Sequence, residues 1–183
     1  MTVTETAIPG LLVIEPAVFG DERGFFTELF HAGKYAEAGV PGPFVQDNLS
    51  RSRRGTLRGL HYQLGRPQGK LVRALSGTVL DVVVDLRRSS AAFGEAVTIE
   101  LDADEHTQAY VPAGCAHGFV VLSETADFFY KCTDLYAPAE ERTLMWNDPA
   151  LDIDWRLDEL GGEPLLSDKD REGLPLADCD TYA

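Results

Sequence analysis

The sequence predicts a mainly β protein, an antiparallel sandwich or barrel with a few short helices. Two observations support this prediction. Short runs rich in β-branched and aromatic residues recur along the chain, and clusters of glycine, proline or polar residues separate them. The chain has 183 residues, enough to bury one substantial core. Many short strands at this spacing favour an antiparallel arrangement over an α/β fold.

The predicted strands are short and end at turn residues. They cover Leu11–Glu15, Phe25–Phe30, Leu71–Leu75, Val79–Leu86, Val97–Leu101, Ala109–Pro112, Gly118–Leu122 and Asp127–Cys132. The tripeptide Ser76-Gly77-Thr78 predicts a hairpin turn between two of them. We expect one helix over Ala32–Ala38, ended by Gly39, and a second after Asp168 with Ser167 as its N-cap.

Composition indicates one globular domain over residues 1–183, without repeats or linkers. Hydrophobic residues make up 44% of the chain, and no stretch reaches the roughly 18 apolar residues of a membrane span. The first six residues lack the basic cluster of a signal peptide. Three widely spaced cysteines, Cys115, Cys132 and Cys179, contain no CxxC pair. These features predict a cytoplasmic protein with reduced thiols.

The charge distribution indicates a small anionic ligand. The formal net charge of -14 argues against binding to nucleic acid or to an anionic membrane. Between positions 51 and 73, however, the chain has no Asp or Glu and seven basic residues: Arg51, Arg53, Arg54, Arg58, Arg66, Lys70 and Arg73. The alternative, a solvated loop, stays open on charge alone.

Two histidines lie in motifs that resemble those of cupins. His61 follows Gly55 in a G-x5-H-x-Q pattern, and His117 ends a P-x-G-x-x-H pattern. Cupins usually gather several histidines and a glutamate around a transition metal. Here Gln63 stands where the second metal-binding histidine belongs, and no glutamate follows within the next few residues. We therefore expect no metal and no cofactor.

A histidine without a metal can act as a general base near neutral pH. His61 and His117 are candidates for this role, although for each taken alone the favoured alternative is a hydrogen-bonded core residue. Lys70, at the start of a predicted strand, could stabilise an oxyanion in the barrel mouth. Tyr130 shares a strand face with Phe128 and could serve as a general acid if nearby cations lowered its pKa. A surface lysine and a packed tyrosine are the alternatives.

Eight motifs, spread along nearly the whole chain, resemble those of a known enzyme family. In chain order they are Phe19-Gly-Asp-Glu-Arg23-Gly-Phe-Phe-x-Glu28, Gln46-Asp47-Asn48-x-Ser50, Leu57-Arg58-Gly59-Leu60-His61, Gln68-Gly69-Lys70-Leu71-Val72, Asp85-Leu86-Arg87, Ala116-His117-Gly118-Phe119, Trp146-Asn147-Asp148 and Leu166-Ser167-x-Lys169-Asp170. Together, these motifs resemble the dTDP-4-dehydrorhamnose 3,5-epimerase family along nearly the whole chain. The resemblance implies a cupin-like jelly-roll β-barrel and an isomerase that needs neither metal nor cofactor.

The implied substrate is a dTDP-linked 4-keto-6-deoxyhexose. Removing a proton from C3 or C5 gives an enolate on O4, and reprotonation from the opposite face inverts the carbon. The resemblance implies that His61 is the base, oriented by Asp170, that Lys70 holds O4, and that Tyr130 is the acid. It assigns the remaining substrate contacts to His117, Arg23, Glu28, Gln46, Asn48 and Arg58, with Phe19 and Phe26 as possible stacking partners of the thymine.

The resemblance also implies a homodimer that exchanges N-terminal strands, so that Arg23 and Glu28 could serve the neighbouring subunit's ligand. Three other functions stay open at this stage. The first is a relative that epimerises C3 or C5 alone, the second is a metal-dependent cupin oxygenase, and the third is a protein that only binds nucleotide sugars. Gln63 argues against the oxygenase, and the set of acid and base residues argues against a mere binding protein.

Overall fold

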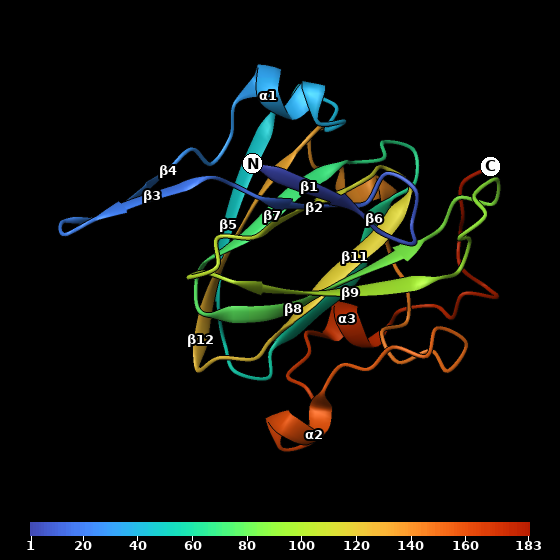
Figure 1. Ribbon diagram of the computed structural model, residues 1–183. Helices are drawn as coiled ribbons and strands as arrows, with labels where there is room; N and C mark the ends of the chain where they lie inside the picture. Colours follow the sequence, from blue (N-terminus) through green and yellow to red (C-terminus); the bar gives the residue numbers. More distant parts are fainter.

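Two antiparallel sheets face each other in the computed structural model, which describes residues 1–183 (Figure 1). Strands account for 44% of the residues and helices for 9%. The predicted fold class, a mainly β cupin-like barrel with a few short helices, is confirmed.

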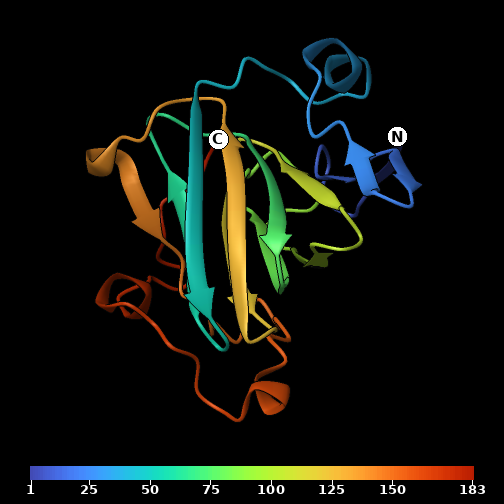
Figure 2. The same cartoon turned by 90° about the vertical axis from the view of Figure 1, so that its left-hand side faces the viewer.

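The larger sheet has six strands in the order β1-β2-β10-β7-β12-β5. Their bounds are Thr2–Glu5 (β1), Leu12–Glu15 (β2), Gln108–Val111 (β10), Lys70–Ser76 (β7), Thr125–Cys132 (β12) and Gln46–Arg53 (β5). The longest pairing joins β12 to β5 over eight residues, from Thr125 opposite Arg53 to Cys132 opposite Gln46. Strand β5 is an edge strand, so its second edge is free for pairing. Figure 2 shows β5 (teal) beside β12 (orange).

The smaller sheet has five strands in the order β13-β6-β11-β8-β9. Their bounds are Glu141–Thr143 (β13), Leu57–Gln63 (β6), Cys115–Val121 (β11), Thr78–Asp85 (β8) and Ala96–Asp102 (β9). The turn between β7 and β8 lies at Gly77, whose φ of 69° suits glycine, as the sequence predicts. In β11 and β6, His117 is directly opposite His61.

The smaller sheet is buried on both faces. Val83 and Phe119 pack toward the larger sheet in a core cluster with Val72 and Phe128. Leu80, Val82 and Val84 face the other way and pack against the C-terminal segment, which includes Trp155 and Tyr182. This double burial explains why β8 reads as an almost continuous apolar run rather than an alternating one.

The helices are short: α1 covers Ala32–Glu37, α2 Leu157–Leu160 and α3 Asp168–Arg171, with a 3-10 turn at Pro138–Glu140. Both predicted helices are confirmed within one residue, and Ser167 caps α3 as expected. No helix has the length and apolar character that a membrane crossing requires.

The structure differs from the predicted strands in two respects, the extent of one strand and the number of strands. The predicted strand Phe25–Phe30 is wrong in extent, because only Gly24–Thr27 (β4) is extended; it pairs with Val18–Asp21 (β3) in a separate two-stranded arm. Five strands were not predicted: the short strands β1, β3 and β13, and the two long strands β5 and β6. The inward positions of β5 and β6 carry polar residues such as Asn48 and His61, because they line a cavity, and the apolar alternation is therefore lost.

The arm formed by β3 and β4 projects away from the barrel (Figure 1). Its aromatic side chains are exposed, with Phe19 at 65% and Phe26 at 68% of their full accessibility, and the two are opposite each other in the hairpin. Isolated two-stranded ribbons are marginally stable in water. Phe25 contacts His106 of its own barrel, with ring centroids 4.4 Å apart, but Phe19 and Phe26 stay exposed and leave apolar surface for a further partner.

Candidate active site

A cavity of about 420 Å³ opens between the two sheets. Its lining is mostly polar, and both sheets contribute to it. The lining residues are Gln46, Asn48, Ser50, Arg58, His61, Tyr62, Gln63, Gln68, Lys70, His117, Gly118, Phe119, Phe128, Tyr130, Cys132, Tyr136, Glu141, Ser167, Lys169 and Asp170. Eight of the twelve site residues expected from the sequence therefore meet here, although they come from segments far apart in the chain.

His61 and Asp170 form a buried pair at this cavity. Nε2 of His61 lies 2.8 Å from Oδ1 of Asp170, although 109 positions separate the two residues. Asp170 is only 3% exposed, whereas a quarter of the His61 side chain is accessible. With Nε2 turned to the carboxylate, Nδ1 is the ring nitrogen left to take up a proton, and no protein group is hydrogen-bonded to it.

The short helix α3 holds Asp170 in place. Ser167 and Asp170 form a capping box, in which the backbone N–H of Asp170 donates to the Ser167 hydroxyl and the backbone N–H of Ser167 donates to Oδ2 of Asp170. The Ser167 hydroxyl also donates to Oδ2 at 2.5 Å. The backbone N–H of Gly59 donates to Oδ1 at 3.0 Å. Burial raises the pKa of Asp170, but the hydrogen bonds from His61, Ser167 and Gly59 outweigh burial and lower it below its usual range. Asp170 is therefore a carboxylate at neutral pH.

Burial lowers the pKa of His61 below its usual value. The contact with Asp170 opposes this effect, while the positive charges of Lys169 and Lys70 add to it. His61 is accordingly neutral near pH 7, with a carboxylate beside it to stabilise the cation once a proton is taken up. This combination suits a general base.

His117 forms a second histidine–carboxylate pair across the sheet. Its Nε2 lies 2.7 Å from Oδ1 of Asp81, which is completely buried and whose other oxygen has no hydrogen-bond partner. Asp81 was not among the site residues predicted from the sequence. The signal was present, because Asp81 interrupts the apolar run of β8 at a position opposite Phe119. A buried carboxylate in such a run needs a partner.

Lys70 enters the cavity from the larger sheet, at the first residue of β7. No carboxylate lies within ion-pair distance of its ammonium group, so the charge is available to a ligand. Burial lowers the pKa of Lys70, an effect that Cys132, Asp81 and Glu141 oppose.

Tyr130 faces the cavity from β12, opposite Asn48 of β5. An acid role for Tyr130 was expected to require a pKa lowered by nearby cations, and that expectation is wrong. Burial raises the pKa of Tyr130, and the nearby Arg58 only partly offsets the effect. Tyr130 therefore remains a protonated phenol at neutral pH, which leaves it able to donate a proton.

Gln46, Asn48 and Arg58 line the same cavity, as expected of ligand contacts. The Gln46 amide donates to Oδ1 of Asn48 at 3.0 Å, and Nε of Arg58 donates to the Ser52 hydroxyl at 3.1 Å. These hydrogen bonds fix the orientation of the side chains and leave further donors for a ligand.

Four expected contacts, Phe19, Arg23, Phe26 and Glu28, lie outside the cavity of their own chain. Arg23 is paired with Asp21 within the arm, and its side chain is 85% exposed. Glu28, just after the arm, accepts from Lys34 at 2.8 Å. Their assignment to the ligand stays a prediction, and it requires that the arm reach another molecule's cavity.

The cationic island of the sequence does not form one patch. Arg51 pairs with Asp127, and Arg66 pairs with Asp134, on the protein surface. Arg73 is buried on the far side of β7, because neighbouring strand residues point to opposite faces. Of the seven basic residues, only Arg58 and Lys70 line the cavity.

A chain of contacts at the cavity mouth was also not predicted from the sequence. The Tyr136 hydroxyl donates to Oε2 of Glu141 at 2.9 Å, and Oε1 of Glu141 lies 2.5 Å from Nζ of Lys169. Lys169 immediately precedes Asp170, so this chain ends beside the His61 pair. Only a carboxylate in the short strand β13 could have signalled it, and acidic residues are common in this chain.

The chain matches the family model described as dTDP-4-dehydrorhamnose 3,5-epimerase over residues 5–178. It is 56% identical over 183 residues to the dTDP-4-dehydrorhamnose 3,5-epimerase of Pseudomonas aeruginosa, a match that covers 100% of this chain and 99% of that protein. The chain belongs to the dTDP-4-dehydrorhamnose 3,5-epimerase family. The resemblance found in the sequence motifs is thereby confirmed.

Solved structures of epimerases share the fold. A dTDP-6-deoxy-D-glucose-3,5-epimerase from Legionella pneumophila, in complex with dTDP-4-keto-L-rhamnose, superposes with a TM-score of 0.93 at 49% identity, covering 98% of this chain and 94% of that one. A 3'-monoepimerase from Streptomyces bikiniensis, in complex with dTDP-quinovose, gives a TM-score of 0.87 at 37% identity, covering 94% and 86%. This epimerase is an isomerase with dTDP-4-dehydrorhamnose 3,5-epimerase activity.

Proposed function

We propose that His61, Asp170, Lys70 and Tyr130 carry out the two epimerisations in this cavity. The observation that carries the proposal is that the acid and the base come from different sheets. His61 belongs to the smaller sheet and Tyr130 to the larger one, so they approach a ligand between the sheets from opposite sides. Inversion of a carbon requires this arrangement, because the proton must leave one face and return to the other.

In the proposed reaction, His61 removes the proton bound to C3 or C5, each of which neighbours the C4 ketone. The electron pair moves onto O4, where the Lys70 ammonium stabilises the enolate. A preorganised charge of this kind typically contributes about a hundredfold or more to the rate. Asp170 stabilises the His61 cation, and Tyr130 donates a proton to the opposite face. His117, held by Asp81, supports the sugar beside His61.

The same cavity suits a nucleotide diphosphate sugar. The guanidinium of Arg58 can bind two phosphate oxygens at once, and the amides of Gln46 and Asn48 offer neutral donors and acceptors beside it. We infer that the ligand is a dTDP-4-keto-6-deoxyhexose. One measurement tests this function directly: incubation with dTDP-4-keto-6-deoxyglucose in heavy water, followed by NMR of the sugar.

Deuterium at both C3 and C5 with inversion is the expected result. Label at only one carbon would instead identify a single-centre epimerase, the alternative that the sequence leaves open. No label at either carbon would contradict the proposed reaction on this sugar.

The pH dependence of the reaction offers a second test. The charged groups that face His61 are Asp170 and Lys169 from the α3 segment, Lys70 from β7 and Glu141 from β13. His61 must be neutral to act as a base, so kcat/KM falls as the pH drops through its pKa. Because that pKa is lowered, the acid limb should lie below about pH 6.5, the ordinary value for histidine.

Two variants should move this limb in opposite directions. Lys169→Met removes a cation that lowers the pKa of His61, so the limb should shift to higher pH. Glu141→Gln leaves the Lys169 charge unbalanced, so the limb should shift to lower pH. A limb that stays in place in both variants would mean that another group, not His61, limits the rate at low pH.

We further propose a homodimer in which the β3–β4 arm of each subunit packs against the other subunit. The free edge of β5 lies beside the cavity, and the arm exposes both its strand edges and its phenylalanines. Pairing of the arm with that edge would bury both surfaces. It would also explain why Arg23 and Glu28 lie outside the cavity of their own chain.

Mixing two inactive variants tests the exchange. If the arm crosses, a dimer of His61→Ala and Arg23→Ala chains contains one complete site, and an equal mixture should recover about a quarter of the wild-type activity. The mixture should stay inactive if each arm serves its own chain. Light scattering of the wild-type protein provides the control, because a monomer would rule out the exchange.

Proposals on domain extent and cellular location rest on the family match and on the cysteines. We propose that residues 1–183 form one epimerase domain, which the family match over residues 5–178 supports. We also propose a cytoplasmic location. Cys115, Cys132 and Cys179 are all free and buried, which fits a reducing compartment.

A further inference from the structure

The loop that follows β12 forms one wall of the cavity mouth. It runs from Thr133 to Ala137 and carries Tyr136, whose ring lines the cavity and whose hydroxyl donates to Glu141. Loops of this kind are mobile unless side chains hold them. The contacts that hold the 133–137 loop in place therefore affect how a ligand binds in the cavity.

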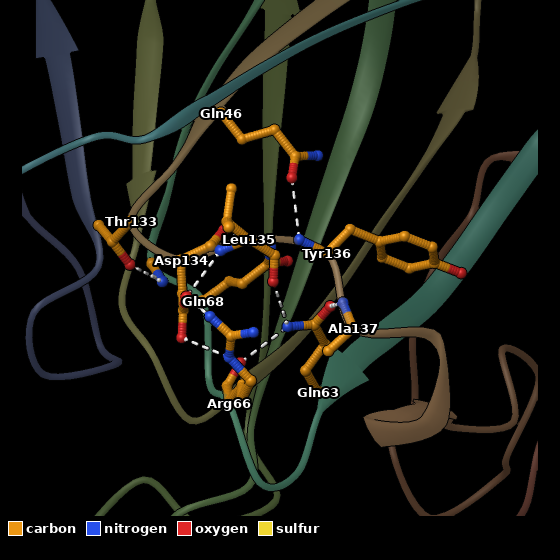
Figure 3. Close-up of polar contacts among 10 residues, drawn as sticks. Gln46, Gln63, Arg66, Gln68, Thr133, Asp134, Leu135, Tyr136 and Ala137 are labelled. Carbon is orange, nitrogen blue, oxygen red and sulfur yellow. Dashed lines mark hydrogen bonds and ion pairs between the residues drawn. The ribbon is translucent and has the colours of Figure 1, made fainter.

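Gln63 makes three hydrogen bonds to this loop and its surroundings (Figure 3). Its Oε1 accepts from the backbone N–H of Ala137 at 2.8 Å. Its Nε2 donates to the backbone carbonyl of Leu135 at 3.3 Å and to that of Arg66 at 2.8 Å. Gln63 is only 4% exposed, so water does not replace these bonds at the surface. Both N–H groups of the amide are used by backbone carbonyls.

Gln63 occupies a position that binds a metal in cupins. It lies two residues after His61 in β6, on the same inward face, where cupins carry a metal-binding histidine. The structure contains no group of three or more His, Cys, Asp or Glu side chains placed to hold a metal ion. The amide of Gln63 instead connects the wall of the cavity to the strand that carries His61.

Other contacts support the loop, but they differ from those of Gln63. Nε2 of Gln68 donates to the carbonyl of Asp134 at 2.7 Å, and Oε1 of Gln46 accepts from the N–H of Tyr136 at 2.9 Å. Arg66 and Asp134 form an ion pair on the surface. Ion pairs on a protein surface contribute little to stability, because water screens them. Of these side chains, only that of Gln63 is hydrogen-bonded to two residues of the loop, Leu135 and Ala137, and at the same time to a residue before β7, Arg66.

We propose that Gln63 is a positioning residue that orders the 133–137 loop before the nucleotide sugar binds. The inference rests on the proposed function, because it assigns the loop to the ligand of that cavity. Without the amide, the loop would have to be ordered during binding, and fixing each residue opposes binding. That loss reduces the binding of the substrate and of the transition state equally, so it appears in KM and leaves kcat nearly unchanged.

The test compares Gln63→Met with the wild-type epimerase. Methionine keeps the approximate volume of glutamine but can neither accept from Ala137 nor donate to the two carbonyls. We expect KM, and the Kd for dTDP measured by calorimetry, to rise about tenfold, while kcat stays within about threefold. Deuterium incorporation at saturating substrate should persist at both carbons. The matched control is Arg66→Met, which removes the surface ion pair of the same loop and should change KM less than about twofold.

Either of two results would overturn the inference. One is an unchanged KM and Kd in Gln63→Met, which would mean that the loop is ordered without the amide. The other is a large fall in kcat at an unchanged KM, which would place Gln63 in the chemistry itself. If Gln63→Met does not fold, Gln63→Asn serves instead, because its amide is one methylene too short to reach all three partners. Failure of the proposed function is separate, since it would appear as absent exchange in the wild-type protein.

Discussion

Replacing His61 with alanine should abolish exchange at both C3 and C5. The expected loss in kcat is at least about a thousandfold, within the range that a positioned general base contributes. The reason is structural: of the two imidazoles in the cavity, His61 is the more accessible, and a carboxylate 2.8 Å from its Nε2 stabilises its cation. NMR in heavy water measures the exchange at each carbon separately.

The binding of dTDP should survive this change. The proposed diphosphate and nucleotide contacts are Gln46, Asn48 and Arg58, none of which is hydrogen-bonded to His61. Calorimetry with dTDP therefore serves as the internal control. His31→Ala is the matched variant, because His31 is exposed at the N-cap of α1, outside the cavity, and its loss should leave exchange unchanged. Substantial exchange at either carbon in His61→Ala would show that a second base acts there.

His117 is the other histidine that could act as a base in this cavity. His117 also contacts a buried carboxylate, Asp81, and it is the cross-strand neighbour of His61. It is only 6% exposed, however, so its ring is less accessible to a substrate. If His117 could replace His61 as a base, the single variant would retain exchange at one carbon. The two histidines would then divide the two centres between them.

The sequence predicts the barrel well because its core strands are apolar and end at turn residues. Strands β7, β8 and β12 are each within two residues of their predicted ends. Among the strands that it does not predict are β5 and β6, which build much of the site. Gln46, Asn48 and Ser50 face inward from β5, where an apolar pattern would have marked a strand, because the cavity needs polar groups there.

The site was predictable only in part, for a related reason. The motifs supply His61, Lys70, Tyr130 and Asp170, but the His61–Asp170 contact depends on the capping box of α3 and on the N–H of Gly59. No local pattern relates positions that lie 109 residues apart. The roles of Asp81 and Glu141 were missed because each is one carboxylate among 30 acidic residues, and only the folded strands bring them to His117 and Lys169.

Replacing Tyr130 with phenylalanine should separate exchange from inversion. His61 can still remove a proton in this variant, and its conjugate acid can return a solvent-derived deuteron to the same face. We expect exchange to fall less than about tenfold, whereas inversion should fall about a hundredfold or more, the usual contribution of a general acid. Comparing deuterium content with the stereochemistry of the recovered sugar measures both rates in one sample.

The control for this experiment is Tyr110→Phe. Tyr110 lies in the same sheet as Tyr130 but packs on the outer face of that sheet, with Leu12 and Leu71, away from the cavity. Its loss should leave both rates unchanged. The raised pKa of Tyr130 adds a further expectation: the phenol should stay protonated across the neutral range, so an alkaline limb below about pH 10 would report loss of the Lys70 charge, whose pKa burial lowers, and should persist in Tyr130→Phe. Equal losses of exchange and inversion in Tyr130→Phe would mean that the phenol only shapes the cavity, and that another group protonates the second face.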